Sequence, residues 1–297
     1  ITLINTLSKK LETFVPIKAG EVSMYHCGPT VYNYLHIGNL RAYVLADLLR
    51  RMFEVNGYKV KQVINITDVG HLVSDADDGE DKVEKMAEKS GKTAREIADF
   101  YTDIFMRDIA KLNIKTDGTI FPKASEHIKE QIEMIQTLER DGHTYITSDG
   151  VYFDTSTFKD YGKLGNIDIE GLKEGARVEV NTEKRHATDF ALWKFSQKDS
   201  AKKRYQEWDS PWGVGFPGWH IECSAMSMKI LGQEIDIHSG AQDLIFPHHT
   251  NEIAQSEAFS GKHFVNYWVH RGFMTIKLDK MSKSKGNLYI LENIVEK

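Results

Sequence analysis

Residues 22–41, VSMYHCGPTVYNYLHIGNLR, begin a strand–turn–helix pattern that determines the fold class. Val22–Cys27 is predicted to be a strand, and the Gly28–Thr30 segment that follows is predicted to be a turn. Apolar side chains then recur at helical spacing over Gly38–Asn56, which predicts a helix. Tyr58–Thr67 is rich in β-branched residues and predicts a second strand. A strand, a helix and a strand in this order predict a βαβ unit and therefore a parallel sheet.

The same alternation resumes near the end of the chain, after a long interruption. Between the two parts, the pattern predicts helices over Lys82–Ser90, Thr93–Leu112 and Ala124–Arg140, and short strands around Thr144–Thr147 and Val151–Asp154. The span 113–208 mixes glycine, charged residues and brief apolar runs, as an insertion does. After it, the pattern predicts a helix over Gly218–Leu231, a strand over Glu234–His238, a helix after Pro247 and a strand over Phe264–His270. The sequence therefore predicts an α/β fold in two βα halves separated by an insertion.

Length and composition exclude several classes of protein. The chain has 297 residues, of which 41% are hydrophobic and 27% charged, so a disordered or fibrous protein is excluded. No apolar run approaches the roughly 18–20 residues that span a bilayer, and the first twenty residues contain no signal-peptide pattern. The two cysteines, Cys27 and Cys223, form no disulfide framework. We therefore expect a cytoplasmic protein without a membrane partner.

Charge is distributed unevenly along the chain. The formal net charge is −5, but the residues from Gly261 onward carry seven Lys and Arg against three Asp and Glu. The end of the sequence is therefore basic and the remainder acidic. This allows a local contact with a polyanion, although the charge alone favours a solvated lysine loop.

A candidate phosphate site lies between the first predicted strand and its helix. The free N–H groups at a helix N-terminus favour phosphate, and Gly38 allows a ligand to approach the backbone closely. Thr30, His36 and Asn39 can donate hydrogen bonds to phosphate oxygens. A turn with a capping asparagine is the alternative reading of these residues.

Near the end of the sequence, Lys280-Met281-Ser282-Lys283-Ser284 is a second candidate for phosphate chemistry. Its two lysines can offset the negative charge that develops on a departing pyrophosphate. We favour this function over that of a solvated basic loop, because the pattern is more specific than a generic basic run.

A third candidate is a metal site. His248 and Glu252 are four residues apart in a predicted helix and therefore project from the same face. Together with Cys27 and Cys223 they supply four groups that can bind zinc, two of them thiolates. Spacing alone leaves open the alternative that the two cysteines are buried core residues.

Five segments occur in an order and spacing that resemble cysteinyl-tRNA synthetase, a class I aminoacyl-tRNA synthetase. They are MYHCGPTVYNYLHIGNLR, NITDV, PGWHIECSAM, HSGAQDLIFPHHTNEIAQSEA and KMSKSKGN, and they extend over nearly the whole chain. His36–Asn39 resembles the HIGH motif of class I enzymes, and Lys280–Ser284 resembles their KMSKS motif.

The resemblance implies a Rossmann-type nucleotide-binding domain split by a connective insertion. Its expected divisions are residues 1–112 and 209–275 for the two halves, 113–208 for the insertion and 276–297 for the lysine loop and the start of a stem-contact region. It implies ATP-dependent activation of L-cysteine to cysteinyl-adenylate, followed by transfer to tRNA(Cys). It also implies Mg²⁺ with ATP and one Zn²⁺ per chain, bound by Cys27, Cys223, His248 and Glu252, which binds the sulfur of the substrate.

The resemblance assigns roles to individual residues. The implied catalytic residues are His36, Asn39, Lys280 and Lys283. The implied ATP-binding residues are Thr30, His36, Gly38, Asn39, Gly240, Asp243, Trp268, Val269 and Lys283. The implied substrate-binding residues are Gly28, Thr67, Trp219 and Asp243. His220 and His249 are the expected substitutes if one metal ligand is misassigned.

Three departures from the family pattern stand out. Asn39 replaces the second histidine of the HIGH motif, although its amide still donates a hydrogen bond. Gly70-His71 and Thr250 replace acidic residues that are common in the family, at positions that are not expected ligands. The sequence ends ten residues after Asn287, where family members continue into a helical anticodon-binding region. Residues 1–297 alone are therefore expected to activate cysteine but to charge tRNA poorly.

Two other functions were weighed against this one. A related ligase of mycothiol synthesis joins activated cysteine to an amino sugar, but CGPTVYNYLHIGN resembles the synthetase version of the segment. A non-catalytic sensor of cysteine would be expected to lack a motif, whereas His36, Lys280, Lys283 and the four metal candidates are present. The resemblance also implies a monomer.

Overall fold

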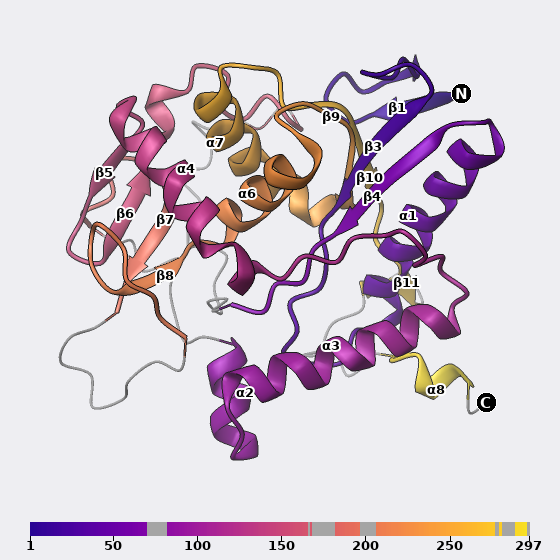
Figure 1. Ribbon diagram of the computed structural model, residues 1–297, viewed down its shortest axis with the longest axis horizontal. Helices are drawn as coiled ribbons and strands as arrows, with labels where there is room; N and C mark the ends of the chain where they lie inside the picture. The colour runs from indigo at the N-terminus through magenta and orange to yellow at the C-terminus, as the bar shows by residue number, and fades with distance from the viewer. Residues whose placement is uncertain are drawn as a thin grey trace.

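The computed structural model describes residues 1–69, 82–165, 167, 182–196, 206–276, 279–280 and 289–295. Its centre is a four-stranded parallel sheet with the strand order β10-β9-β3-β4 (Figure 1). The strands are β3 (Glu21–His26), β4 (Lys59–Ile64), β9 (Ile235–Ala241) and β10 (Val265–Arg271). The two inner strands come from opposite halves of the sequence, so the sheet joins the two predicted βα halves. The predicted α/β fold is confirmed.

One face of the parallel sheet packs against helix α1 (Ile37–Val55). Val22 and Met24 of β3 pack there with Leu49 and Phe53 of the helix in an apolar core. On the same side, α3 (Ala94–Lys111) packs on α1, where the rings of Tyr43 and Phe105 lie 4.9 Å apart. Because both faces of the sheet are covered, the inner strands are buried along most of their length.

The opposite face carries helices α6 (Trp219–Leu231) and α7 (Thr250–Ser260). Because side chains alternate along a strand, Tyr25 of β3 faces these helices, whereas Met24 faces α1. Tyr25 packs with Cys223 of α6 and Ile253 of α7. The predicted metal ligand Cys223 therefore lies on this face of the sheet, between the sheet and the helices.

A second sheet, antiparallel and of order β5-β6-β7-β8, lies beside α4 and α6 (Figure 1). Its strands are β5 (Thr144–Ile146), β6 (Gly150–Phe153), β7 (Phe190–Phe195) and β8 (Gly215–Pro217). Its apolar face packs on α4 (Ile128–Arg140), which follows the short helix η1 (Ala124–His127). β7 and β8 were not predicted, and β8 lies beyond residue 208. The predicted divisions at residues 112, 208 and 275 stay a prediction.

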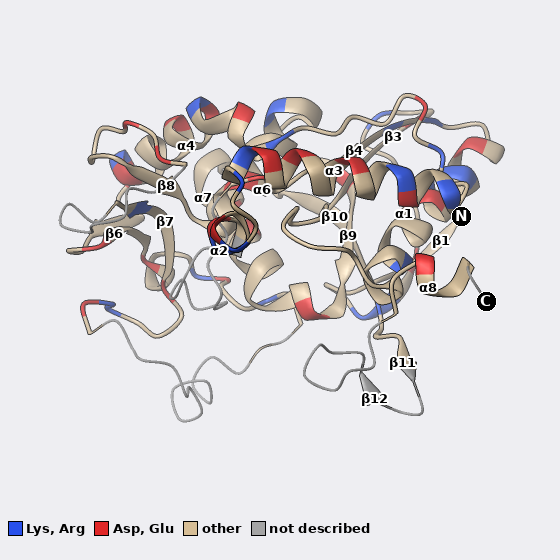
Figure 2. Cartoon of the chain, turned by 90° about the horizontal axis from the view of Figure 1, so that it is seen from below, with Lys and Arg blue, Asp and Glu red and all other residues tan. Residues whose placement is uncertain are grey.

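Smaller elements complete the described chain. They are the hairpin β1 (Thr2–Asn5) with β2 (Lys10–Thr13), the helix α2 (Lys82–Ser90), the short helices η2 (Thr155–Thr157) and η3 (Gln242–Leu244), the hairpin β11 (Thr275–Ile276) with β12 (Asp279–Lys280), and α8 (Glu292–Val295). The β1–β2 hairpin protects the edge strand β10, because the side chain of Asn5 accepts a hydrogen bond from the backbone of Trp268 at 3.0 Å. β11 and β12 project from the body of the protein (Figure 2).

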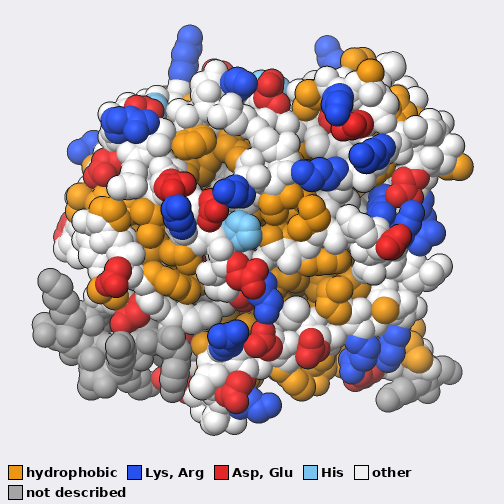
Figure 3. All heavy atoms as spheres, viewed as in Figure 1, with side chains coloured by type: hydrophobic (Ala, Val, Ile, Leu, Met, Phe, Trp, Pro, Cys, Tyr) orange, Lys and Arg blue, Asp and Glu red, His pale blue; other side chains and the backbone are white. Residues whose placement is uncertain are grey.

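No helix in the described part of the chain is long and apolar enough to cross a membrane. Acidic and basic residues both occur along α1, α3 and α4 (Figure 2), and charges of both signs lie among apolar side chains on the face seen in Figure 3. On that face the described residues therefore form no large surface of one charge.

Candidate metal and nucleotide site

Polar side chains meet at the carboxyl edge of the parallel sheet. Cys27 comes directly after β3, Thr67 follows β4, and His238 lies within β9. Because the strands are parallel, their carboxyl ends lie at one edge, where open α/β sheets bind ligands. Helix α1 begins at the same edge, and an isolated parallel bridge joins Thr30 to Thr67.

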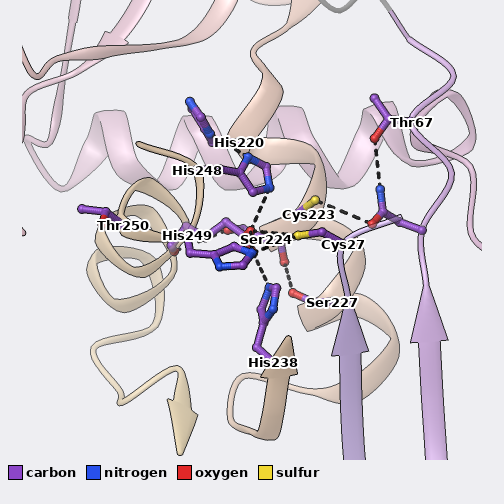
Figure 4. A network of polar contacts seen from close by, with 12 residues as sticks. Cys27, Thr67, His220, Cys223, Ser224, Ser227, His238, His248, His249 and Thr250 are labelled. Atoms are coloured by element: carbon purple, nitrogen blue, oxygen red, sulfur yellow. Dashed lines mark hydrogen bonds and ion pairs between the residues drawn. The ribbon is translucent and has the colours of Figure 1, made fainter. Parts of the chain in front are cut away.

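The structure brings the four predicted metal ligands together. One ligand atom each from Cys27, Cys223, His248 and Glu252 lies within 4.8 Å of every other. In Figure 4 the two sulfur atoms point toward the same place as the rings of His248 and His249. Three of the four residues are fully buried, and Cys27 is partly buried. A single ion placed between these atoms can reach all four.

The chain reaches this arrangement through a turn that the sequence did not predict. The short turn η4 (Ile245–His249) precedes α7, and it is kinked, because Phe246 within it has an extended backbone with φ −136° and ψ 133°. It presents His248 so that Nε2 lies 2.9 Å from Oε1 of Glu252, one helical turn later. The predicted i, i+4 relation therefore holds across the boundary between η4 and α7.

A second group of ligands overlaps the first. The second group consists of Cys27, His238, His249 and Glu252, so Cys27 and Glu252 belong to both groups. Its four ligand atoms also lie within 4.8 Å of one another. The Cys27 sulfur lies 3.2 Å from Nε2 of His249. The first group contains two thiols instead of one, and soft thiolate ligands favour zinc. The chemistry of the donors thus favours the first group.

Residues outside the first group orient its members. Nδ1 of His220 lies 2.9 Å from Nδ1 of His248, and Nε2 of His238 lies 2.9 Å from Oε2 of Glu252. The amide oxygen of Asn65 accepts hydrogen bonds from the backbone N–H of Gly28 at 2.8 Å and from the Cys223 thiol at 3.8 Å. Metal-binding side chains usually have such partners, which fix their orientation.

The protonation of the group also suits a cation. Burial raises the pKa of the Cys27 thiol, whereas the bond from Cys27 and the nearby His248 lower the pKa of Cys223 to about 6, against the effect of burial. Burial opposes ionisation of Glu252, but His238 and His248 lower its pKa to about 2. Burial also disfavours the charge on His248, yet Glu252 and Cys223 raise its pKa to about 10. Cys223 and Glu252 therefore carry negative charge in a buried place beside a protonated His248, and a metal ion that bound there would displace that proton.

Two buried atoms beside the ligands lack hydrogen-bond partners among the described residues, namely Nδ1 of His238 and Oε2 of Glu222. Burying an unpaired polar group is costly, so such atoms mark a place where a ligand completes the contacts. The donor set of two thiols, one imidazole and one carboxylate is within the range that zinc accepts. The residues present therefore fit a zinc ion.

The predicted phosphate site lies at the start of α1. His36 is the residue before the helix, and its Nδ1 accepts a hydrogen bond from the backbone N–H of Asn39 at 3.2 Å. Gly38 is buried in the first turn. Tyr289 binds the same turn, because its carbonyl accepts a hydrogen bond from the backbone N–H of Ile37 at 2.8 Å. The structure thus forms the predicted helix N-terminus, with His36 as its cap.

Close backbone contacts explain two of the predicted glycines. A Cβ atom on Gly28 would lie 1.4 Å from the carbonyl oxygen of Asn65. A Cβ atom on Gly240 would lie 2.7 Å from the ring of His249 and 2.9 Å from Leu244. Both positions exclude a side chain because neighbouring groups at the carboxyl edge occupy that space.

The other predicted residues lie at different distances from the metal candidates. The rings of Trp219 and His248 are 4.5 Å apart, so Trp219 lies at the metal group. Thr67 accepts a hydrogen bond from the side chain of Asn65 at 3.1 Å, and Asn65 in turn accepts a hydrogen bond from the Cys223 thiol. Thr67 is thus linked to the metal group through Asn65. Asp243 is exposed in η3, directly after β9. Their roles in binding substrate stay predictions.

Trp268 occupies a different environment from the one expected. It is fully buried, and its ring stacks on His238 at 4.5 Å. Its backbone N–H donates to Asn5, and its carbonyl accepts from Thr6 at 2.8 Å. Val269 packs on the α1 side of the sheet. The backbone N–H and carbonyl of Trp268 are thus already engaged, and the ATP-binding role implied for Trp268 and Val269 stays a prediction.

The predicted lysines are only partly visible. The backbone of Lys280 pairs with Thr275 in the β11–β12 hairpin, and nothing is described of its side chain. Lys283 lies outside the described residues, as do Gly70 and His71.

Sequence reasoning missed several residues of this edge. They are Asn65, Glu222 and His270, together with the contact that His238 makes to Glu252. Each lies inside, or next to, a segment that carries another site residue, for example Asn65 two residues before Thr67. A search for polar residues at the carboxyl ends of all four strands would have found Asn65 and His270.

Comparison with known proteins places the chain among tRNA synthetases. The family model described as "tRNA synthetases class I (C) catalytic domain" matches residues 13–297. The chain is 53% identical over 297 residues to a cysteine–tRNA ligase of Treponema denticola, which covers 100% of this chain and 60% of that protein. It is 55% identical over 295 residues to cysteine–tRNA ligase 1 of Burkholderia lata, which covers 99% of this chain and 62% of that protein. The chain thus spans about 60% of the length of these curated relatives.

Solved structures share the fold. The structure of Mycobacterium tuberculosis methionyl-tRNA synthetase in complex with methionyl-adenylate matches with a TM-score of 0.69 and 16% sequence identity, over 93% of this chain and 62% of that chain. At this identity the similarity concerns the fold alone, which is the Rossmann-type catalytic fold of class I synthetases.

Proposed function

The chain belongs to the family of class I (C) tRNA synthetase catalytic domains, and we propose that it activates L-cysteine with ATP for transfer to tRNA(Cys). The observation that carries the proposal is the meeting of Cys27, Cys223, His248 and Glu252 at the edge of the sheet where α1 begins. A metal group that can bind a thiol therefore lies at the same edge as a helix N-terminus that can bind phosphate. The activation of cysteine by ATP requires both.

In the proposed reaction, the carboxylate of cysteine attacks the α-phosphorus of ATP and pyrophosphate leaves. Catalysis of such a step depends mainly on positioning and on stabilising charge. His36 and Asn39 would hold phosphate oxygens at the start of α1, and Lys280 and Lys283 would offset the charge of pyrophosphate together with Mg²⁺. Thr30 and Gly38 would border the same phosphates. No protein nucleophile is required, so neither cysteine acts as one.

Cys27, Cys223, His248 and Glu252 would hold a zinc ion, which, when bound, supplies a coordination position for the sulfur of the substrate. Gly28, Thr67, Trp219 and Asp243 would border the amino acid, and Gly240 and Asp243 the ribose side of the nucleotide. A serine hydroxyl is a harder and much less acidic group than a thiol. The residues of the site can therefore reject serine without a separate editing site.

The test is cysteine-dependent exchange of pyrophosphate with ATP, measured on zinc-loaded protein with serine as the control amino acid. We expect exchange with cysteine and none above background with serine. Lys283→Ala should lower the rate of exchange about 10²–10³-fold, with a smaller change in the KM for cysteine. The absence of exchange in folded, zinc-loaded protein would contradict the proposal.

The acceptor is tested separately, on the intact native protein. The proposal expects cysteine to be transferred to tRNA(Cys) and not to an amino sugar. The family relationship supports the first acceptor, because both relatives named above are cysteine–tRNA ligases. We also propose that the protein is a monomer and acts in the cytoplasm. The free thiols of Cys27 and Cys223 agree with a reducing compartment.

A further inference from the structure

The exposed aromatic side chains of the described residues gather in one place. Three are exposed, namely Tyr34 by 40%, Phe100 by 44% and Tyr289 by 36%. Tyr34 lies two residues before the helix cap His36, and the carbonyl of Tyr289 is bonded to Ile37. Phe100 lies on α3 and is linked to Tyr34 through one further ring. Tyr34 and Tyr289 therefore lie beside the start of α1, and Phe100 is connected to Tyr34 through Tyr101.

Tyr34, Tyr101 and Phe100 form a continuous row of rings, called the aromatic row below. The centroids of Tyr34 and Tyr101 are 5.5 Å apart with their planes at 86°, and those of Tyr101 and Phe100 are 5.1 Å apart at 80°. Tyr101 also packs on the core between α2 and α3, so the middle ring is held in place. The outer rings thus present stable surfaces to solvent.

A positive charge lies on the aromatic row. Nζ of Lys92 is 5.0 Å from the centre of the Phe100 ring. Asp99, next to Phe100 on α3, is paired with Lys123 at 2.8 Å and with Arg95 at 3.8 Å. Glu96, one turn earlier, accepts hydrogen bonds from Thr93 at 2.8 and 2.9 Å. A cation beside exposed rings suits a ligand that combines flat bases with phosphates.

A comparison with the β1–β2 hairpin indicates what the row binds. The hairpin region also exposes large apolar side chains, but these are the aliphatic residues Ile4, Leu11, Val15 and Ile17. Aliphatic side chains contact any apolar surface, whereas exposed rings beside cations are the means by which proteins stack unpaired bases. Unlike these aliphatic residues, the aromatic row is connected to the start of α1, because Tyr34 lies two residues before the helix cap His36.

We propose that Tyr34 and Phe100 stack the unpaired nucleotides at the 3′ end of the acceptor RNA as it approaches the start of α1. This inference rests on the proposed function, because that function requires the end of an RNA to reach this edge. It extends the function by naming a surface for the single strand. The duplex part of the RNA and its anticodon are not involved.

The test measures binding of a four-nucleotide single-stranded RNA that carries 2-aminopurine, whose fluorescence falls when the base stacks. The native protein and the variants Tyr34→Ala and Phe100→Ala are compared. We expect each variant to bind the strand about tenfold more weakly and to quench less. Tyr34→Phe keeps the ring and should restore both. Leu11→Ala, on the hairpin, is the matched control and should change neither.

Cysteine-dependent pyrophosphate exchange is measured on the same proteins and should be unchanged in Tyr34→Ala and Phe100→Ala. A loss of exchange in these variants would overturn the inference, because it would show a role in the site itself. Unchanged RNA binding, or an equal loss in Leu11→Ala, would also overturn it. Self-association of the native protein that Tyr34→Ala abolishes would assign the row to a second copy instead. Since RNA binding is measured directly, failure of exchange in the native protein would count against the proposed function alone.

Discussion

Both faces of the parallel sheet are covered by helices, but they differ in chemistry. On the α1 face, Val22 and Met24 contact Leu49 and Phe53 in an apolar core, beside which a small polar group of His26, Gln62 and Arg50 is buried. The α6–α7 side buries many more polar residues. Eleven of them are at most 2% exposed: His220, Glu222, Ser224, Ser227, His248, His249, Thr250, Asn251, Glu252, Gln255 and Ser256.

This difference separates stability from chemistry. Burial of polar groups is costly unless they are hydrogen bonded. On the α6–α7 side much of that cost is offset by a network, in which Ser224 accepts hydrogen bonds from Gln255 at 2.7 Å and from Ser256 at 2.8 Å. The α1 face can therefore supply stability while the other face holds a polar site. Substitutions on the two faces should have separable effects.

The largest effect is expected for Cys223→Ser, on the polar face. It removes one of two thiols, and even the loss of a residue that merely orients a metal ligand costs about 10–100-fold in metal affinity. We expect more than 100-fold weaker zinc binding and a sharply raised KM for cysteine. The measurement is zinc content after dialysis against a chelator, with circular dichroism as the control for folding. Zinc retained at full stoichiometry would remove Cys223 from the site.

The second effect is expected on the opposite face, for Phe53→Ala. The Phe53 ring is fully buried and lies 4.6 Å from that of Phe14, so its removal leaves a cavity. We expect a loss of about 3–5 kcal/mol in the free energy of unfolding, measured with urea, and no change in zinc content. If zinc were lost from protein that is still folded, the two faces would not be independent.

A smaller effect is expected for His220→Gln, which changes a residue that orients His248. The Nδ1 atoms of the two rings are 2.9 Å apart. We expect about 10–100-fold weaker zinc binding, less than for Cys223→Ser. Competition with a chelator of known affinity measures both variants. An effect as large as that of Cys223→Ser would instead make His220 a direct ligand.

The smallest effect concerns pH and His26, which is buried and whose Nδ1 lies 2.5 Å from the hydroxyl of Ser239. Burial, with a contribution from His238, lowers the pKa of His26 to about 3. In the unfolded chain its pKa is near 6.5, so below that pH the unfolded state binds one more proton and stability falls as pH decreases towards 3. At pH 5.5 this costs about 1.4 kcal/mol. Urea unfolding at pH 7.5 and 5.5 should show that difference for the native protein relative to His26→Gln, and equal losses in both would contradict it.

The sequence predicted the strands and helices of the parallel sheet well, because periodicity and glycine placement are local signals. Cys27 and Cys223 are distant in sequence, and no spacing rule joins them. They meet because β3 and α6 pack together, so their pairing was predicted only through the family resemblance. The short strands β7 and β8 were missed because their pairing partners lie far away in the sequence.

Other features of the site depend on tertiary contacts. The extended backbone of Phe246 within η4 (Ile245–His249) was not predicted, because the sequence around Pro247 has the pattern of a helix start. Asn65 acts through contacts to Gly28 and Cys223, which belong to other elements. The engagement of the Trp268 backbone by the β1–β2 hairpin likewise follows only from the packing of that hairpin.

We propose a zinc site on the polar face that binds the sulfur of the substrate cysteine. Its most direct test is X-ray absorption at the zinc edge of the purified protein. We expect one zinc per chain with two sulfur ligands, those of Cys27 and Cys223. Addition of L-cysteine should raise the count to three, whereas L-serine should leave it at two. A protein without stoichiometric zinc, or a sulfur count that cysteine does not change, would contradict the account.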